Sequence, residues 1–258
     1  MTASLLPSRF SASVFRYFCL LLLLLTLGGN VAQAQAELQI QPYDASSTTN
    51  AILMGLGGTL TGVSIYLDRG VPVQKEEDLV LLEIDKIYPI DRYSTRHFSL
   101  RADEMTDKLL LGAFASPFLL LMDDRGRGNF NDLSLIVFEG ALINSGLINL
   151  SKVLVRRPRP YNYNPDAPLD FKLKKSARYS FFSGHTSTAA YFSMTSAKLF
   201  NDLYPDSRAR PYVWAGAALV PVLVSYGRMK AGRHFFTDVL VGFVVGSAIA
   251  ITVPELHK

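Results

Sequence analysis

Apolar residues gather in long runs along this chain, and polar residues fall mostly between the runs rather than alternating within them. Long runs are typical of buried or membrane-embedded helices, whereas half-buried strands show a two-residue alternation. Six runs follow the N-terminal region, at 51–67, 109–122, 133–150, 181–200, 212–226 and 235–253. The pattern predicts an all-α fold, a helical bundle.

The region around the first run differs in composition from the rest. Residues 37–50 are polar and rich in Ser and Thr, and residues 71–108 are rich in charged side chains. The apolar spacing within 79–87 predicts a short amphipathic helix. We therefore expect a lead-in over 37–108, with one apolar helix and a charged amphipathic segment, followed by a core over 109–258.

The length of the runs favours a membrane protein. A helical span needs about 20 mostly apolar residues, and several runs are shorter or hold polar residues such as Glu139 and Asn144. Polar groups inside a membrane usually face the interior of a bundle, so they do not exclude spans. We expect a polytopic membrane protein with five or six spans, and a soluble helical bundle is the alternative.

The N-terminus predicts an export signal. Arg9 and Arg16 precede an apolar run at 17–27, and the small residues of AQAQA follow at 32–36. This order is typical of a cleaved signal peptide, which we place at 1–36, and an uncleaved anchor is the alternative. The single cysteine, Cys19, lies in this leader, so the mature chain would have neither a disulfide nor a cysteine nucleophile.

The charge balance limits the classes of partner. The chain has 26 Lys and Arg residues against 22 Asp and Glu residues, a formal net charge of +4. A mildly basic protein can meet nucleic acid, anionic lipid or a phosphorylated substrate. The sequence has no zinc-finger spacing, aromatic RNA-binding motif or basic helix with heptads. We therefore expect no nucleic-acid partner.

Candidate chemistry is concentrated in three fragments, of which GRMKAGRHFFTD (227–238) is the last. His234 and Asp238 are four residues apart, so they would share a face of a helix. The carboxylate could then accept from His234 Nδ1–H and leave Nε2 free to attack. Arg228 could reach an oxyanion beside His234. The alternative is a surface His–Asp pair that stabilises a helix start.

The second fragment, FSGH (182–185), begins a predicted helix. Ser183 can cap that helix, and Gly184 permits a close backbone approach. Free N–H groups at such a helix start bind anions, and His185 could donate a proton to a leaving oxygen. The alternative is an ordinary N-cap followed by a partly exposed histidine.

The first fragment, KVLVRRPRP (152–160), follows an apolar run. Lys152 and Arg159 could converge on phosphate oxygens, and the guanidinium group of Arg159 offers a planar fork. Arg156 and Arg157 are interpreted as spare surface charge. The alternative is a basic stretch that attracts lipid head groups.

In this order and spacing, the three fragments resemble the type 2 phosphatidic acid phosphatase superfamily, which includes bacterial class A acid phosphatases and vanadium haloperoxidases. The family pattern is Lys, six residues, Arg-Pro; then Pro-Ser-Gly-His; then Ser-Arg, five residues, His, three residues, Asp. The chain departs from it at Phe182, in place of proline, and at Gly227, in place of serine. Neither departure removes a group with a proposed chemical role.

The resemblance implies an all-helical, metal-independent phosphatase that uses no cofactor. His234 would attack phosphorus, Asp238 would orient it, and His185 would protonate the leaving oxygen. The implied phosphate-binding residues are Lys152, Arg159, Ser183, Gly184 and Arg228.

Charge in the loops predicts the side of the membrane on which the fragments lie. Arg125 and Arg127 fall in one short loop, and Arg208 and Arg210 in another, which the positive-inside rule places in the cytoplasm. The fragments then face outward if the leader is cleaved and 51–67 does not span. A retained leader that does not span, followed by six spans, gives the same result. We expect an active site on the periplasmic face of a bacterial inner membrane, and a soluble periplasmic protein is the alternative.

An outward-facing site among apolar helices predicts an anionic lipid phosphate as substrate, such as phosphatidic acid, an undecaprenyl diphosphate or lipid A. Three alternatives stay open. The first is a soluble periplasmic acid phosphatase that acts on water-soluble phosphomonoesters. The others are a vanadium haloperoxidase and a non-enzymatic protein that binds anionic lipid through its basic loops.

Overall fold

The computed structural model describes residues 41–45 and 47–258, and every regular element in that part of the chain is a helix. The predicted all-α class is therefore confirmed. The predicted signal peptide, residues 1–36, lies outside the described residues. The long helices are α2 (Ser47–Asp68), α5 (Leu100–Ala115), α7 (Phe130–Val155), α9 (Gly184–Leu203), α10 (Arg210–Lys230) and α11 (Phe236–Glu255).

Each long helix overlaps one of the six apolar runs, and α5 differs most from its run. It begins at Leu100, within the charged region, where the side chain of Ser99 caps the helix by accepting from Ala102 N at 3.2 Å. The helix therefore crosses the expected boundary between residues 108 and 109. As a result, charged residues of the lead-in and apolar residues of the core share one helix.

Short helices fill the connections. They are α3 (Glu76–Val80), η1 (Ile84–Lys86), η2 (Pro89–Asp91), α4 (Arg92–Thr95), η3 (Ser116–Met122), α6 (Asp124–Gly128), η4 (Pro160–Tyr163), α8 (Leu169–Lys172) and η5 (Lys175–Arg178). The prediction of an amphipathic helix over 79–87 is wrong, because α3 ends at Val80. Arg92 donates to the carbonyl groups of Asp85 and Ile87, both at 2.9 Å, and holds this segment in turns instead.

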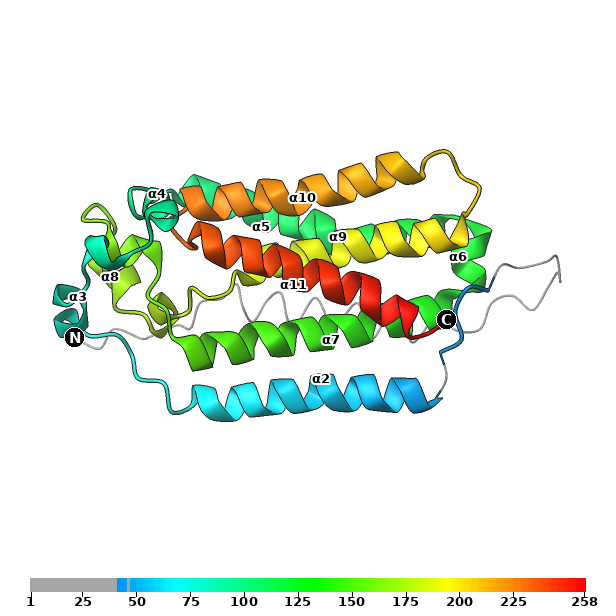
Figure 1. Cartoon of the computed structure of the whole chain (residues 1–258), viewed down its shortest axis with the longest axis horizontal. Coiled ribbons are helices and arrows are strands. Elements are labelled where there is room, and N and C mark those ends of the chain that lie inside the picture. Colours follow the sequence, from blue (N-terminus) through cyan, green and yellow to red (C-terminus); the bar gives the residue numbers. More distant parts are fainter. Residues whose placement is uncertain (1–40, 46) are drawn as a thin grey trace, which may run out of the picture. The chain divides into compact units, whose positions relative to one another are not determined.

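Helix α9 lies at the centre of the bundle and packs against α5, α7, α10 and α11, whereas α2 packs mainly against α7 (Figure 1). Glycines of α11 allow the closest approach. A Cβ atom on Gly246 would lie 2.2 Å from the carbonyl oxygen of Ser187, and one on Gly242 would lie 2.6 Å from that of Ser183. This packing of small residues brings the first turn of α11 against the first turn of α9.

Four helical segments are long and apolar enough to cross a membrane: Thr48–Asp68, Leu100–Met122, Phe130–Tyr163 and Phe236–Glu255. Helices α9 and α10 fall outside this set. Helix α9 lies at the centre of the bundle, where it contacts other helices rather than lipid. It can therefore carry polar side chains, which make it less apolar than the four candidate spans. Ser187 Oγ of α9, for example, donates to Asn144 Oδ1 of α7 at 2.6 Å. The predicted membrane character is thus supported by four candidate spans.

The packing of α10 against α5 explains why glycine stands at position 227. A Cβ atom there would lie 2.3 Å from Thr106 Cγ2, and Thr106 is only 1% exposed. Thr106 cannot turn away freely, since its Oγ1 donates to the carbonyl of Asp103 at 2.7 Å. Gly227 therefore permits a contact between two helices that serine would hinder.

Gly227→Ser is expected to destabilise the protein by about 1–3 kcal/mol, because an overpacked contact forces the helices apart. Gly227→Ser/Thr106→Ser should recover most of this loss, since the second change removes the opposing methyl group. Gly216→Ser, on the same helix but with open space around the Cβ position, is the matched control. Thermal unfolding in detergent measures all three. Equal midpoints for the 227 and 216 variants would show that the close approach is not a constraint.

Candidate active site

The three fragments meet at one end of the bundle. They supply the end of α7, the start of α9, and the connection from α10 to α11, and α4 and α8 lie at the same end (Figure 1). Helices that are far apart in the sequence therefore have the termini that carry the fragments at the same end of the bundle. The predicted grouping of the fragments is therefore present in the fold.

His234 lies in the connection before α11 and is 1% exposed. Its Nδ1 is 2.7 Å from the carbonyl oxygen of Ser180 and 3.9 Å from Asp238 Oδ2. A carbonyl group can only accept, so Nδ1 carries the proton and Nε2 is left without one. The tautomer is the expected one, but the expected direct bond from Nδ1 to Asp238 is replaced by a bond to Ser180.

The reason for this difference is where α11 begins. The helix starts at Phe236, so His234 precedes it and the four-residue spacing does not place His234 and Asp238 on one helical face. Asp238 instead accepts from Phe235 N at 2.9 Å and from Ser180 Oγ at 2.5 Å. Asp238 thus acts on His234 through Ser180, whose hydroxyl it holds and whose carbonyl orients the imidazole.

Arg157 holds Asp238 from the other side, so its interpretation as spare surface charge is wrong. Its guanidinium donates to Asp238 Oδ1 at 2.5 Å, to Asp91 Oδ2 at 2.8 Å and to Thr237 Oγ1 at 2.8 Å. The group also lies 4.0 Å above the Phe235 ring. Both carboxylates are fully buried, and the shared cation offsets much of the cost of burying their charges.

The three predicted phosphate-binding cations surround His234. Arg159 is buried and uses its Nε to donate to the carbonyl of Ser176 at 2.8 Å. Lys152 lies against the start of α9, where a Cβ atom on Gly184 would be 3.1 Å from Nζ. Lys152, in the last turn of α7, therefore reaches the turn that begins α9.

Arg228 comes from α10 and is held by α5. Its Nη1 donates to Asp103 Oδ1 and, at 3.1 Å, to Thr106 Oγ1. Among the described residues its buried Nε has no hydrogen-bond partner. An unsatisfied buried donor beside the buried imidazole of His234 fits a site that receives an anion.

The electrostatic environment keeps His234 neutral. Burial and the nearby charges of Arg159, Arg228 and Lys152 hold the pKa of His234 well below its usual value. A neutral imidazole with a free Nε2 is the form that can attack an electrophile. The same cations would stabilise negative charge on a bound phosphate.

The Ser-Gly turn differs in detail from the expectation. Ser183 caps α9, and its Oγ accepts from Thr186 N at 3.4 Å. Its own N–H donates to the carbonyl of Asp238 at 3.0 Å, so this N–H is not available to a phosphate. The N–H groups of Gly184 and His185 belong to the first helical turn and have no intrahelical acceptor. These two groups are the ones that can meet an anion.

His185 is held from α5. Its Nε2 lies 2.8 Å from Asp107 Oδ1, and the two side chains are 29% and 25% exposed. Asp103, one turn earlier on α5, pairs with Arg228 and Arg233. The sequence reasoning missed Asp91, Asp103 and Asp107, because no motif links them to fragments that lie far along the chain.

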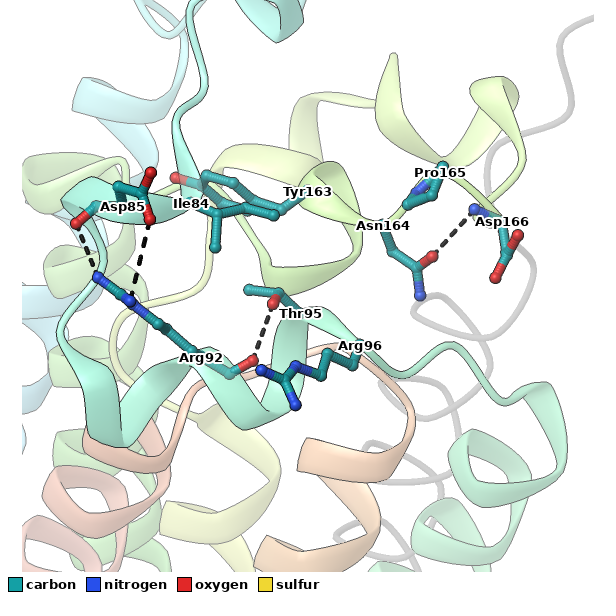
Figure 2. A pocket seen from close by; sticks show the side chains of 9 residues that line it. All are labelled: Ile84, Asp85, Arg92, Thr95, Arg96, Tyr163, Asn164, Pro165 and Asp166. Atoms are coloured by element: carbon teal, nitrogen blue, oxygen red, sulfur yellow. Dashed lines mark hydrogen bonds and ion pairs between the residues drawn. The ribbon is translucent and has the colours of Figure 1, made fainter.

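A cavity of about 450 Å³ flanks the site between α4 and the segment after η4 (Figure 2). Its lining residues are Ile84, Asp85, Arg92, Thr95, Arg96, Tyr163, Asn164, Pro165 and Asp166. Tyr163 connects this lining to the site, because its ring packs against that of Phe235, the residue after His234, with centroids 6.3 Å apart. None of the predicted site residues lines this cavity, so it adjoins the proposed reaction centre without containing it.

Residues 133–258 match the family model of the PAP2 superfamily, and every predicted site residue lies within that range. Phospholipid phosphatase 2 of Mus musculus is 25% identical over 196 residues, which cover 59% of this chain and 69% of the relative. Lipid A 4'-phosphatase of Porphyromonas gingivalis is 31% identical over 83 residues, or 32% of each chain.

A crystal structure of a transmembrane PAP2 type phosphatidylglycerolphosphate phosphatase from Bacillus subtilis is also similar. The match covers 81% of this chain and 94% of that one, with 21% sequence identity and a TM-score of 0.40. This score is too low for the likeness to carry an argument.

Proposed function

Because this chain belongs, through residues 133–258, to the PAP2 superfamily and is a phosphatase, we propose that it hydrolyses a phosphate or diphosphate ester of a lipid through a phosphohistidine at His234. The observation that carries the proposal is the buried neutral imidazole of His234 with three cations around it. Such cations hold the equatorial oxygens of phosphorus, where charge is spread in the transition state. The proposed reaction requires no metal ion.

In the first step, His234 Nε2 attacks phosphorus and an N–P bond forms as the P–O bond to the leaving alkoxide breaks. Ser180 holds the Nδ1 proton, and Asp238 holds Ser180. His185 gives a proton to the departing oxygen, so that the alcohol leaves neutral. The proposed phosphate-binding groups are Lys152, Arg159, Arg228 and the N–H groups of Gly184 and His185.

In the second step, His185 takes a proton from water as the water oxygen attacks phosphorus. The N–P bond breaks, inorganic phosphate is released, and His234 returns to its neutral form. Over the two steps one water is consumed and the protons balance. The chain would thus act as a phosphoric monoester hydrolase on its simplest substrates.

A lipid substrate is proposed because four helices could cross a membrane and the site lies at one end of them. The named relatives, a phospholipid phosphatase and a lipid A 4'-phosphatase, act on lipids. With α9 and α10 counted beside the four candidate spans, we propose six spans. A soluble periplasmic phosphatase would leave the exposed apolar side chains of these helices, such as Leu111 at 69% and Val244 at 57% exposure, in water.

We propose that the site faces the periplasm of a bacterial inner membrane. Helix α2 begins at the end of the bundle opposite to the site (Figure 1). If α2 spans the membrane, an outward-facing site requires its start to lie in the cytoplasm, which fits a retained leader that does not itself span. A cleaved leader followed by a spanning α2 would instead place the site in the cytoplasm. The arginines at 125, 127, 208 and 210 favour the first arrangement.

Phosphate release from phosphatidic acid in detergent micelles, with EDTA present, tests the proposed function. We expect the wild-type protein to release phosphate and the His234→Ala protein to give only the background rate. Complete loss of wild-type activity with EDTA would rule out the metal-free mechanism. Faster hydrolysis of water-soluble esters than of phosphatidic acid would favour the soluble-ester alternative. Repeating the assay with externally added short-chain substrate in sealed right-side-out vesicles reads the side on which the site lies.

A further inference from the structure

We propose that Asp107 is a positioning residue that orients His185 for proton transfer, so that the site contains a second histidine–carboxylate pair. The inference rests on the proposed phosphatase mechanism, in which His185 is the proton donor. Asp107 Oδ1 lies 2.8 Å from His185 Nε2, across 78 residues of sequence. Asp107 is on α5, outside the segment that matches the PAP2 superfamily.

The hydrogen bond determines which nitrogen of His185 exchanges its proton. A carboxylate accepts, so His185 Nε2 carries a proton that it donates to Asp107. His185 Nδ1 has no hydrogen-bond partner within residues 41–45 and 47–258. Asp107 therefore leaves Nδ1 to give a proton to the leaving oxygen and to take one from water. The Nε2 proton stays on the imidazole throughout the cycle.

Charge gives Asp107 a second effect on His185. Burial disfavours the charged form of this imidazole, and the positive charges of Arg228 and Lys152 also oppose its protonation. A proton donor must carry the extra proton before it can give it away. The carboxylate of Asp107, in direct contact with the ring, stabilises the imidazolium form against the cations that hold the phosphate.

Asp107 is available for this task because the neighbouring carboxylate neutralises the arginines. Asp103 lies one turn earlier on α5 and pairs with both Arg228 and Arg233. Asp107 makes its one described side-chain hydrogen bond to His185. One face of α5 thus supplies a carboxylate for the phosphate-binding arginine and another for the proton donor.

The test compares two esters that differ in their need for an acid. An alkyl phosphate loses a strongly basic alkoxide, which requires a proton, whereas p-nitrophenyl phosphate loses a stable phenolate. We expect Asp107→Asn to lower kcat/KM about 10- to 100-fold for the alkyl ester and less than about threefold for p-nitrophenyl phosphate. The parameter kcat/KM is chosen because it covers only the steps up to departure of the leaving group.

Glu104→Gln, an exposed change on the same helix, is the matched control and should leave both values unchanged. Asp107→Glu should recover part of the loss with the alkyl ester. An equal loss of kcat/KM for both esters would mean that Asp107 only stabilises the contact between α5 and α9. No loss of kcat/KM for either ester would mean that Asp107 does not orient His185 for proton transfer. If the wild-type protein releases phosphate from neither ester, the proposed function fails instead, so the two failures are distinguishable.

Discussion

A protein with alanine at position 234 is expected to hydrolyse its substrate at least about 10⁴-fold more slowly than the wild type, since loss of a covalent nucleophile is among the largest single-residue effects in catalysis. The buried Nε2 of His234 carries no proton, because Nδ1 donates to Ser180. The charges of Arg159, Arg228 and Lys152 all act on this imidazole and help to keep it neutral. Steady-state phosphate release measures the loss.

Two further variants separate chemistry from folding. His234→Asn keeps a donor that can reach the Ser180 carbonyl, so it should fold normally and stay inactive. His97→Ala removes a histidine at the same end of the bundle whose ring contacts Tyr93 and Lys230, and it should stay active. Rapid quenching of the wild-type reaction should trap a phosphohistidine that the His234 variants lack. More than a tenth of wild-type activity in His234→Asn would exclude His234 as the nucleophile.

Arg157→Met is expected to destabilise the protein by about 3–5 kcal/mol, because it leaves two buried carboxylates without their shared cation. Asp91 and Asp238 are both fully buried, and Arg157 contacts each of them. Activity should fall as well, since Asp238 holds the Ser180 hydroxyl beside the carbonyl that orients His234. Thermal unfolding in detergent measures the first effect and phosphate release the second.

The neighbouring arginine provides the control for this prediction. Arg156 is exposed and uses its Nε only for the carbonyl of Val153, so Arg156→Met should change stability by no more than about 0.5 kcal/mol. Arg157→Met/Asp91→Asn should recover part of the lost stability, because it removes one of the two unpaired charges. Similar unfolding midpoints for the two single variants would mean that the buried carboxylates do not depend on Arg157.

The two predictions concern different layers of the same site. In the proposed mechanism His234 meets the substrate, whereas Arg157 contacts residues that hold His234 in place. The path from Arg157 to His234 runs through Asp238 and Ser180, and each link is a hydrogen bond of 2.5–2.7 Å. A site built in this way is preorganised by buried groups that the substrate never touches.

Local patterns in the sequence determined the helices and the residue types of the site. Apolar runs predicted six long helices, because a helix that is buried on all sides is apolar along most of its length. Spacing within short fragments singled out Lys152, Arg159, His185 and His234, since each fragment keeps its residues within a few positions of one another. The amphipathic helix over 79–87 failed because Arg92, outside that window, binds its carbonyl groups.

Only the tertiary structure decided which groups those residues meet. His234 bonds to Ser180 across 54 residues, Arg157 to Asp238 across 81, and His185 to Asp107 across 78. Such pairs depend on which helices pack together and on where each helix ends. The spacing of residues within a short fragment shows neither the packing nor the helix ends. The start of α11 at Phe236 is the clearest example. His234 lies two residues before the helix, so its Nδ1 bonds to the backbone carbonyl of Ser180 and not to Asp238.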